Sequence, residues 1–261
     1  MEELAEELLP AIRYHFGWAT ADGAPVAEDS GKRLRPALAL LSAEAVGAHP
    51  HVALPGAVAV ELIHNFSLIH DDVIDGDTER RHRPTVWTCF GTDEALIAGD
   101  ALHSLAFQVL LAEALPPRVA SAQRLVGATT AMIAGQAADM AFDDVPVVTL
   151  TDCRVMEEAK TGALLGYAAS VGAVLAEAEV NVIDALEKYG RQLGLAYQAV
   201  DDVLGIWGDS AVTGKPAGND LREGKKSMPV AVVLSRGGKA SEDLTEIYGC
   251  LLYTSDAAHD T

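Results

Sequence analysis

Three aspartates lie close together near the end of an apolar stretch, and three arginines follow them: Asp71, Asp72, Asp75, Arg80, Arg81 and Arg83. On a helix, Asp71 and Asp75 would share a face, because residues four apart are stacked. Stacked carboxylates repel each other by roughly a few tenths of a kcal/mol. Such oxygen ligands suit Mg²⁺, which is usually held by one or two carboxylates with waters and substrate phosphates. The alternative is a solvated helix end with surface ion pairs.

A second acidic cluster, about 130 residues further along the chain, makes the metal interpretation stronger. Gln198, Asp201 and Asp202 interrupt an apolar stripe over residues 195–209. Burying unpaired carboxylates is costly, and a metal held between facing helices would satisfy both clusters. The sequence therefore predicts that Asp71 and Asp201 lie on facing helices around one apolar hollow.

The basic residues are concentrated near these clusters, although the chain as a whole is acidic, with a formal charge of −19. Arginine and lysine bind phosphate oxygens directly, so the pattern indicates a polyanionic ligand bridged to the aspartates by metal. Of the nineteen basic residues, eleven lie in or beside motifs: Lys32, Arg33, Arg35, Arg80, Arg81, Arg83, Lys160, Lys215, Arg222, Lys225 and Lys226.

Composition narrows the class of protein. A chain this acidic is a poor candidate for non-specific nucleic-acid binding. Three cysteines without metal-ligand spacing fit a reducing compartment. The first ten residues are acidic where a signal peptide would be basic. The longest uncharged run, residues 161–176, is too short to span a membrane and predicts a buried helix. We expect a cytoplasmic protein with no membrane span.

The apolar periodicity indicates one all-α domain. Residues 145–150 could form a strand, but alone it would have no partner. Residues 250–258, "CLLYTSDAA", resemble a translated sequencing adapter; we interpret 250–261 as a non-native tail and 1–249 as the C-terminally truncated domain. Helices are predicted over residues 36–47, 56–75, 93–115, 118–141, 152–176 and 180–207.

The motifs together resemble the trans-isoprenyl diphosphate synthases, particularly actinobacterial members, over residues 10–235. The matching motifs, in the family's order, are "GKRLRP" (31–36), "LIHDDVID" (68–75), "RR" (80–81), "KTG" (160–162), "QAVDD" (198–202), "TGKP" (213–216) and "DLREGKKS" (220–227). The resemblance implies an all-α isoprenoid synthase fold, with long antiparallel helices around a central cavity, in a homodimer. It also implies head-to-tail joining of isopentenyl diphosphate to an allylic diphosphate.

The resemblance also implies a role for each motif residue. Asp71 and Asp75 would bind two Mg²⁺ and Asp201, with Asp202, a third. Gln136 and Asp139 would support the metal shell, and Thr161 and Gln198 would present oxygen to the developing carbocation beside the allylic diphosphate. That diphosphate would be held by Arg80, Lys160, Lys215 and Lys225. Isopentenyl diphosphate would be held by Lys32, Arg35, His64 and Arg81.

Two departures from the family pattern bear on activity. The second motif is commonly DDxxD, but position 205 is glycine; Asp202, water or Asp209 would then complete the third metal site. Family members also continue for several more helices. Upstream of Asp71, the bulky Phe66 and the small Ser67 would set where the growing chain stops, which favours a C20 or C15 product. Phe66 could equally be a core aromatic.

Three alternatives remain open at this stage. A class I terpene cyclase shares the fold and the metal chemistry but needs only one diphosphate site. A non-catalytic partner subunit or a prenyl-lipid binding module would be consistent with Gly205. An acidic helical scaffold would bind no diphosphate.

Overall fold

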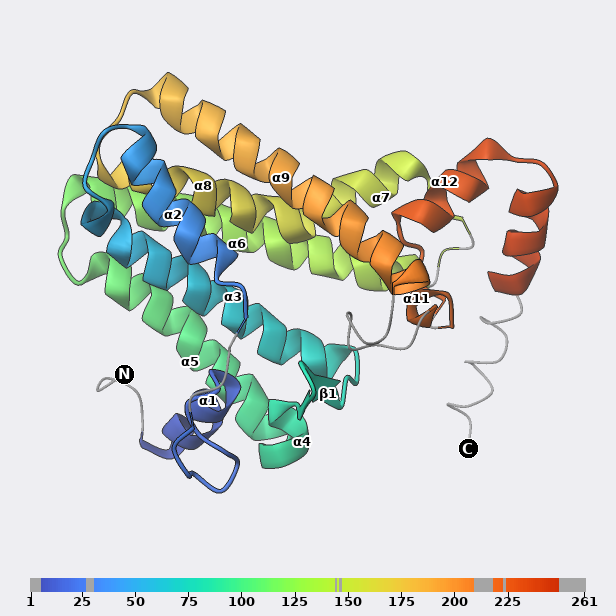
Figure 1. The fold of residues 1–261 in the computed structure, drawn as a ribbon, viewed down its shortest axis with the longest axis horizontal. Helices are drawn as coiled ribbons and strands as arrows, with labels where there is room; N and C mark the ends of the chain where they lie inside the picture. Colours follow the sequence, from blue (N-terminus) through green and yellow to red (C-terminus); the bar gives the residue numbers. More distant parts are fainter. Residues whose placement is uncertain are drawn as a thin grey trace. The chain divides into compact units, whose positions relative to one another are not determined.

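The computed structural model is helical, with a single short hairpin in the part of the chain that it describes (Figure 1). The chain forms two compact units: unit 1 is Met1–Val126 with Tyr167–Glu187, and unit 2 is Gly127–Gly166 with Lys188–Thr261. The structure describes residues 6–26, 31–143, 145, 147–208, 218–222 and 224–248.

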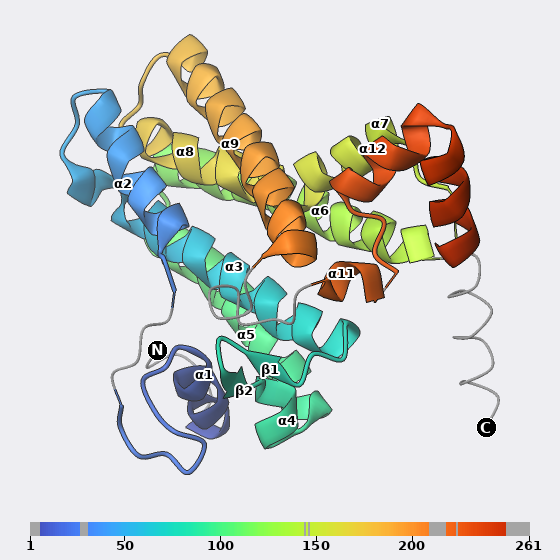
Figure 2. The ribbon, with the colours of Figure 1, turned by 45° about the vertical axis from the view of Figure 1, so that its right-hand side comes forward.

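Unit 1 is built around two long helices, α3 (Leu54–Ile74) and α5 (Thr92–Leu111), which lie side by side (Figures 1 and 2). Ile63 and Leu102 are fully buried in its core. The shorter elements of this unit are η1 (Glu6–Leu8), α1 (Leu9–His15), α2 (Leu34–Ala45), η2 (Pro50–Ala53) and α4 (Val86–Phe90).

Three helices pass from one unit to the other: α6 (Pro116–Asp143), α8 (Ala163–Leu175) and α9 (Val180–Trp207). The predicted buried helix in residues 161–176 is confirmed, because every residue of α8 is buried. Small residues allow its close packing in unit 1. A Cβ added at Gly172 would lie 2.5 Å from the Ala43 nitrogen, and Gly56 packs directly on Val171.

Unit 2 contains α7 (Leu150–Glu157), a π-helical segment η3 (Glu158–Gly162), α11 (Asn219–Arg222) and α12 (Met228–Arg236). Residues 239–248 are also helical. The start of α7 corrects a prediction: the helix predicted from residue 152 begins at Leu150, and Thr149 caps it. The Thr149 hydroxyl accepts from the Asp152 N–H at 3.1 Å in a capping box.

A hairpin follows α3, although no strand was predicted in this part of the sequence. In it β1 (Glu79–Arg80) pairs with β2 (Arg83–Pro84). Strands of two residues are too short to produce an alternation of apolar and polar residues. At the turn, Arg81 and His82 have φ of 52° and 61°, the left-handed pair that usually selects Asn-Gly. Other contacts must therefore hold this turn.

The predicted helices are largely confirmed. The helix over 180–207 has the predicted bounds in α9. Pro116 and Pro117 begin α6, whereas α5 ends earlier, at Leu111; proline lacks an N–H but fits a first helical turn. The described residues of 145–150 form no strand.

Two helical segments, Pro50–Ile74 and Thr92–Leu111, are long and apolar enough to cross a membrane by length and composition alone. Core helices of soluble proteins meet the same criterion, and 56% of the most apolar window of the first is buried. This finding is weak support for a membrane span, and the absence of a span stays a prediction.

Candidate active site

The last turns of α3 present the first aspartate cluster. The Asp75 N–H donates to the Asp71 carbonyl at 2.8 Å, so the helical turn that stacks these two residues is formed. Asp71 is half-buried and Asp75 exposed, whereas Asp72 is only 2% exposed. The three aspartates therefore differ in environment, with Asp71 and Asp75 more accessible to a ligand than Asp72.

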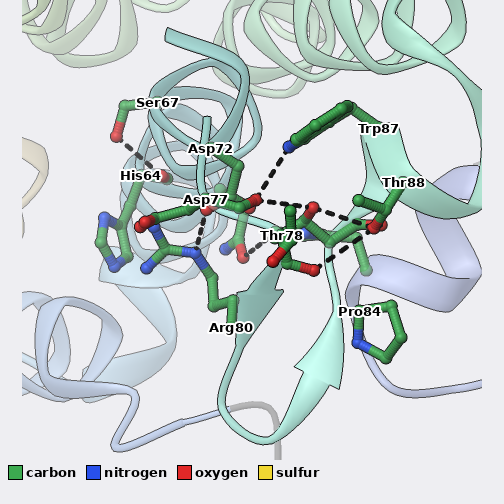
Figure 3. Close-up of polar contacts among 12 residues, drawn as sticks. His64, Ser67, Asp72, Asp77, Thr78, Arg80, Pro84, Trp87 and Thr88 are labelled. Atoms are coloured by element: carbon green, nitrogen blue, oxygen red, sulfur yellow. Dashed lines mark hydrogen bonds and ion pairs between the residues drawn. The ribbon is translucent and has the colours of Figure 1, made fainter. Parts of the chain in front are cut away.

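Asp72 is paired with the hairpin. Arg80 Nε donates to Asp72 Oδ1 at 2.7 Å (Figure 3). Burial raises the pKa of Asp72 above its ordinary value, although the charge of Arg80 opposes the shift. The base of the hairpin is fixed by Trp87, whose Nε1 donates to the Asp77 carbonyl at 2.8 Å. Arg80, predicted to hold the allylic diphosphate, is thus oriented by a buried carboxylate.

A basic pocket of about 350 Å³ lies in unit 1 between α1 and the hairpin. Sequence reasoning assigned no role to α1, yet α1 holds β2. The Tyr14 hydroxyl donates to the Pro84 carbonyl at 2.7 Å, and the Arg83 guanidinium lies 4.3 Å from the Tyr14 ring centroid. Residues lining the pocket include Tyr14, His15, Asp72, Arg80, Arg81 and Arg83.

The residues predicted to hold isopentenyl diphosphate also converge in unit 1. Burial lowers the pKa of His64, and the charges of Arg35 and Arg81 lower it further, so both cations lie near this imidazole. A Cβ at Gly31 would lie 2.9 Å from Cζ of Arg81, which brings the "GKRLRP" loop against the hairpin. Lys32 in the same loop is exposed. The structure thus brings Arg35, His64 and Arg81 together.

His15 is a further imidazole of this pocket and makes stability depend on pH. Its Nε2 lies 2.9 Å from Asn65 Oδ1. Burial lowers the pKa of His15 from 6.5 to about 4. The hydrogen bond to Asn65 raises this pKa, whereas the charges of Arg80, Arg81 and Arg83 lower it further. As pH falls, the imidazole is protonated in the unfolded chain at a higher pH than in the folded chain. We therefore expect the stability contributed by the neutral, buried His15 to be lost as pH falls from 6.5 to about 4.

His15→Gln should therefore flatten the pH dependence of the unfolding free energy in this window. Urea unfolding at intervals between pH 7 and 4 measures it, and exposed His51→Gln serves as the control. Equal slopes for wild type and His15→Gln would contradict the assignment.

Unit 2 places the "KTG" residues in the π-helical segment η3. Lys160 Nζ donates to Asp139 Oδ2 of α6 at 2.6 Å. The Thr161 hydroxyl donates to Gln198 Oε1 of α9 at 2.9 Å. Glycines permit this approach: a Cβ at Gly194 would lie 2.6 Å from Cα of Gly162. Single π-helical turns are frequent at functional sites.

Gln136 and Asp139 differ in their contacts. Asp139 holds Lys160, whereas Gln136 Oε1 is buried without a hydrogen-bond partner in the described part of the chain. An unpaired buried amide oxygen is costly and is the kind of group that a bound cation or water would satisfy. The predicted supporting role of these two residues stays a prediction.

The two aspartates of the second cluster are not equivalent. Asp201 is exposed, whereas Asp202 is 6% exposed and accepts from Gln198 Nε2 and from the Met228 N–H, at 2.9 and 2.8 Å. Burial, and then Asp202 itself, raise the pKa of Glu157 to about 8. Asp202 thus already accepts hydrogen bonds from protein groups, which favours a supporting role for it over direct metal ligation.

Some predicted residues cannot be placed. Lys215 and Asp209, like the proposed tail at 250–261, lie outside the described residues. Lys225 is exposed beside α11. Asp71 and Asp201 belong to different units, so their predicted common hollow stays a prediction.

The donor sets fit Mg²⁺. Among the described residues, no three His, Cys, Asp or Glu side chains come together closely enough to hold a metal by themselves. Mg²⁺ does not require such a cage, because it keeps waters and binds one or two carboxylates plus phosphate oxygens. Asp71 and Asp75, stacked at the end of α3, offer that set.

Phe66 packs within unit 1. It is 9% exposed, and its ring makes edge contacts with His70 and His103, at centroid distances of 4.8 and 5.1 Å. The Ser67 hydroxyl donates to the His64 carbonyl at 2.9 Å (Figure 3). These contacts fit both the core and the chain-length interpretations of Phe66.

Sequence reasoning missed Tyr14, His15 and Glu157, and gave Arg83 no role of its own. The available signals were the third arginine after "RR" and the motif "YHFGW" (14–18), since α1 is too short for periodicity to reveal this helix.

Comparison with known proteins now decides the family. The polyprenyl synthetase model matches residues 23–258. The chain belongs to the polyprenyl synthetase family. The predicted resemblance and the predicted enzyme class, a prenyltransferase, are thereby confirmed, and family members generally use Mg²⁺.

Individual relatives agree with this membership. The chain is 51% identical over 244 residues to (2E,6E)-farnesyl diphosphate synthase of Mycobacterium tuberculosis, covering 93% of this chain and 68% of that protein. It is 43% identical over 251 residues to geranylgeranyl diphosphate synthase of the same species, covering 95% and 71%.

A solved structure confirms the isoprenoid synthase fold. The polyprenyl synthetase from Streptomyces coelicolor A3(2) is 52% identical and matches with a TM-score of 0.90, covering 95% of this chain and 73% of that one.

Proposed function

We propose that this polyprenyl synthetase joins isopentenyl diphosphate head-to-tail to an allylic diphosphate and makes a short-chain trans-prenyl diphosphate, C15 or C20. The observation that carries this proposal is a set of basic side chains in unit 1 besides the Asp72–Arg80 pair: the guanidinium groups of Arg35 and Arg81 come together there with the imidazole of His64. A second anion site is what a condensing enzyme requires and a cyclase does not.

The chain's own residues would bind and orient both substrates. Arg80 and Lys160, each oriented by an aspartate, would hold the allylic diphosphate with Lys215 and Lys225. Lys32, Arg35, His64 and Arg81 would hold isopentenyl diphosphate at its own site, which supplies proximity. Bound Mg²⁺, three per active site in this proposal, would neutralise the diphosphate charge that develops as the allylic bond breaks.

The Thr161–Gln198 pair would stabilise the allylic cation, because both side chains present oxygen atoms. Apolar side chains around the substrate would exclude water that could otherwise quench that cation. The final proton would most simply be accepted by the released pyrophosphate.

The test is incubation of the full chain with Mg²⁺, radiolabelled isopentenyl diphosphate and each allylic primer in turn, followed by separation of products by length. Label in a C15 or C20 diphosphate supports the proposal. A parallel incubation with allylic diphosphate alone tests the cyclase: release of hydrocarbon without isopentenyl diphosphate would contradict condensation. Metal-dependent diphosphate binding without any turnover would instead favour a non-catalytic partner subunit.

We also propose a homodimer. Exposed apolar side chains on α5, including Ile97 and Leu111, at 52% and 45% exposure, would become buried in such an assembly. Light scattering at several concentrations measures it, and a monomer throughout would contradict it.

Phe66→Ala should lengthen the product. Removal of the ring that contacts His70 and His103 would leave space into which a growing apolar chain can extend. Product chromatography would show the added isoprene units. Leu62→Ala, a truncation one turn earlier on the same helix, controls for general loosening of the packing. An unchanged product distribution for Phe66→Ala would assign Phe66 to the core alone.

A further inference from the structure

We propose that Tyr14 of α1 is a positioning residue for isopentenyl diphosphate, because it holds the hairpin turn from which Arg81 reaches the substrate. This inference rests on the proposed function, in which Arg81 is one of the isopentenyl diphosphate ligands. It gives α1 a part in substrate affinity, although α1 supplies no ligand of its own in that proposal.

The turn between β1 and β2 has a backbone that needs support from other parts of the chain. Arg81 and His82 have φ of 52° and 61°, a left-handed conformation in which a Cβ is crowded against the following carbonyl. Asn-Gly would favour such a turn, but here both residues carry large side chains. Each strand is only two residues long and adds few hydrogen bonds of its own. The position of Arg81 therefore depends on what holds the strands on either side of the turn.

Tyr14 contacts β2 in two ways, and α1 lies beside the hairpin (Figure 2). Its hydroxyl donates to the Pro84 carbonyl at 2.7 Å, and its ring centroid lies 4.3 Å from Cζ of Arg83. Tyr14 is 6% exposed and packs edge-on against Phe90 of α4, at a centroid distance of 5.5 Å. Burial raises the pKa of Tyr14 to about 12, so the hydroxyl keeps its proton at ordinary assay pH. Tyr14 is thus a fixed donor that anchors β2.

The two arginines after α3 are held differently, which decides which substrate should be affected. Arg80 is fixed by the buried carboxylate of Asp72, at 2.7 Å. Arg81 lies at the turn itself, and a Cβ at Gly31 would lie 2.8 Å from its Nη2. Burial lowers the pKa of His64 and the charge of Arg81 lowers it further, so these two side chains are neighbours. A shift of β2 should therefore weaken isopentenyl diphosphate binding more than allylic diphosphate binding.

The experiment measures the dissociation constant of isopentenyl diphosphate for the full chain by isothermal titration calorimetry, without allylic substrate. Tyr14→Phe removes one hydrogen bond and keeps the ring over Arg83. It should raise this dissociation constant about fivefold, the factor that corresponds to one net hydrogen bond. Tyr14→Leu, which also removes the ring, should raise it by at least about tenfold. For Tyr14→Phe, the dissociation constant of a non-reacting thio analogue of the allylic diphosphate, with Mg²⁺, should change by less than about twofold.

Tyr167→Phe is the matched control. Tyr167 is a buried tyrosine of the same unit, and its hydroxyl lies 2.8 Å from Ser121 Oγ. Loss of that hydroxyl should lower the melting temperature, but it should leave the dissociation constant of isopentenyl diphosphate at the wild-type value. A loss of affinity in Tyr167→Phe equal to that in Tyr14→Phe would assign Tyr14 to general stability and overturn the proposal.

A double variant tests whether Tyr14 acts through Arg81. Arg81→Gln should weaken isopentenyl diphosphate binding, and adding Tyr14→Phe should weaken it no further, because the group that Tyr14 positions is already gone. Wild-type affinity in Tyr14→Phe would overturn the proposal, and so would additive losses in the double variant or a wild type that does not bind isopentenyl diphosphate. If the wild type binds isopentenyl diphosphate but forms no prenyl product, the proposed function fails, and the same titrations still decide the role of Tyr14.

Discussion

Asp71→Asn is expected to lower kcat by about 100- to 1000-fold and to leave the KM for isopentenyl diphosphate nearly unchanged. The amide keeps the size of the side chain but removes the charge that Asp71 and Asp75 together offer to Mg²⁺. Stabilisation of the departing diphosphate is then lost mainly in the transition state, which affects kcat more than binding. The cations proposed for isopentenyl diphosphate are other residues and remain intact.

Steady-state kinetics at several Mg²⁺ concentrations measures this effect. Asp100→Asn is the matched control, because Asp100 lies on α5 of the same unit with 75% of its side chain exposed. Its kcat should stay at the wild-type value. A kcat for Asp71→Asn within tenfold of wild type, or full recovery on adding Mg²⁺, would remove Asp71 from the metal site.

Arg80→Gln should both destabilise the fold and abolish most activity. Asp72 is 2% exposed, and Arg80 is its ion-pair partner at 2.7 Å. Removing one partner of a buried pair typically costs about 3–5 kcal/mol. We expect about 3 kcal/mol, the low end of that range, because the Arg80 side chain is 30% exposed and solvent screens part of the interaction.

The destabilisation should depend on pH. Burial already raises the pKa of Asp72, and Arg80 opposes that shift, so the variant should have a still higher pKa. A carboxyl whose folded pKa is raised contributes stability at low pH that is lost as pH rises through that pKa. Urea unfolding should therefore show a larger deficit at pH 8 than at pH 5.

The double variant Asp72→Asn with Arg80→Gln separates stability from catalysis. It should recover most of the unfolding free energy, because no buried charge is left unpaired, but not the activity, because the diphosphate still lacks its arginine. A double variant with wild-type kcat would contradict the proposed role of Arg80 as a substrate ligand. A single variant as stable as wild type at pH 8 would contradict the structural role.

Long periodic elements were the parts of the fold that could be predicted from residue patterns. The helix over 180–207 was found at its true ends because twenty-eight residues carry a consistent helical apolar pattern. The hairpin of β1 and β2 was missed because two-residue strands have no period to detect, and α1 because seven residues give barely two turns. The first residue of α7 was placed two positions late because two threonines, Thr149 and Thr151, could have capped it.

The candidate site likewise contains residues that could be predicted from the sequence and residues that could not. Residue types and spacings were enough to single out Asp71, Asp75, Lys160 and Asp201, since carboxylates one turn apart and clustered cations imply their chemistry locally. They could not distinguish Asp202 from Asp201, because burial and the Met228 contact depend on segments far away in the chain. They also could not find Tyr14, which acts on the hairpin across seventy residues.

The sequence by itself thus determined the helical class and the enzyme family, and it singled out the residues predicted to bind a metal and a diphosphate. These properties follow from local periodicity and from side-chain chemistry, which neighbouring residues encode. Only the tertiary structure decided which charges are paired inside the protein, such as Asp72 with Arg80 and Lys160 with Asp139, and which side chain of α1 contacts the hairpin. Those outcomes depend on packing between segments distant in sequence, and no local pattern records that packing.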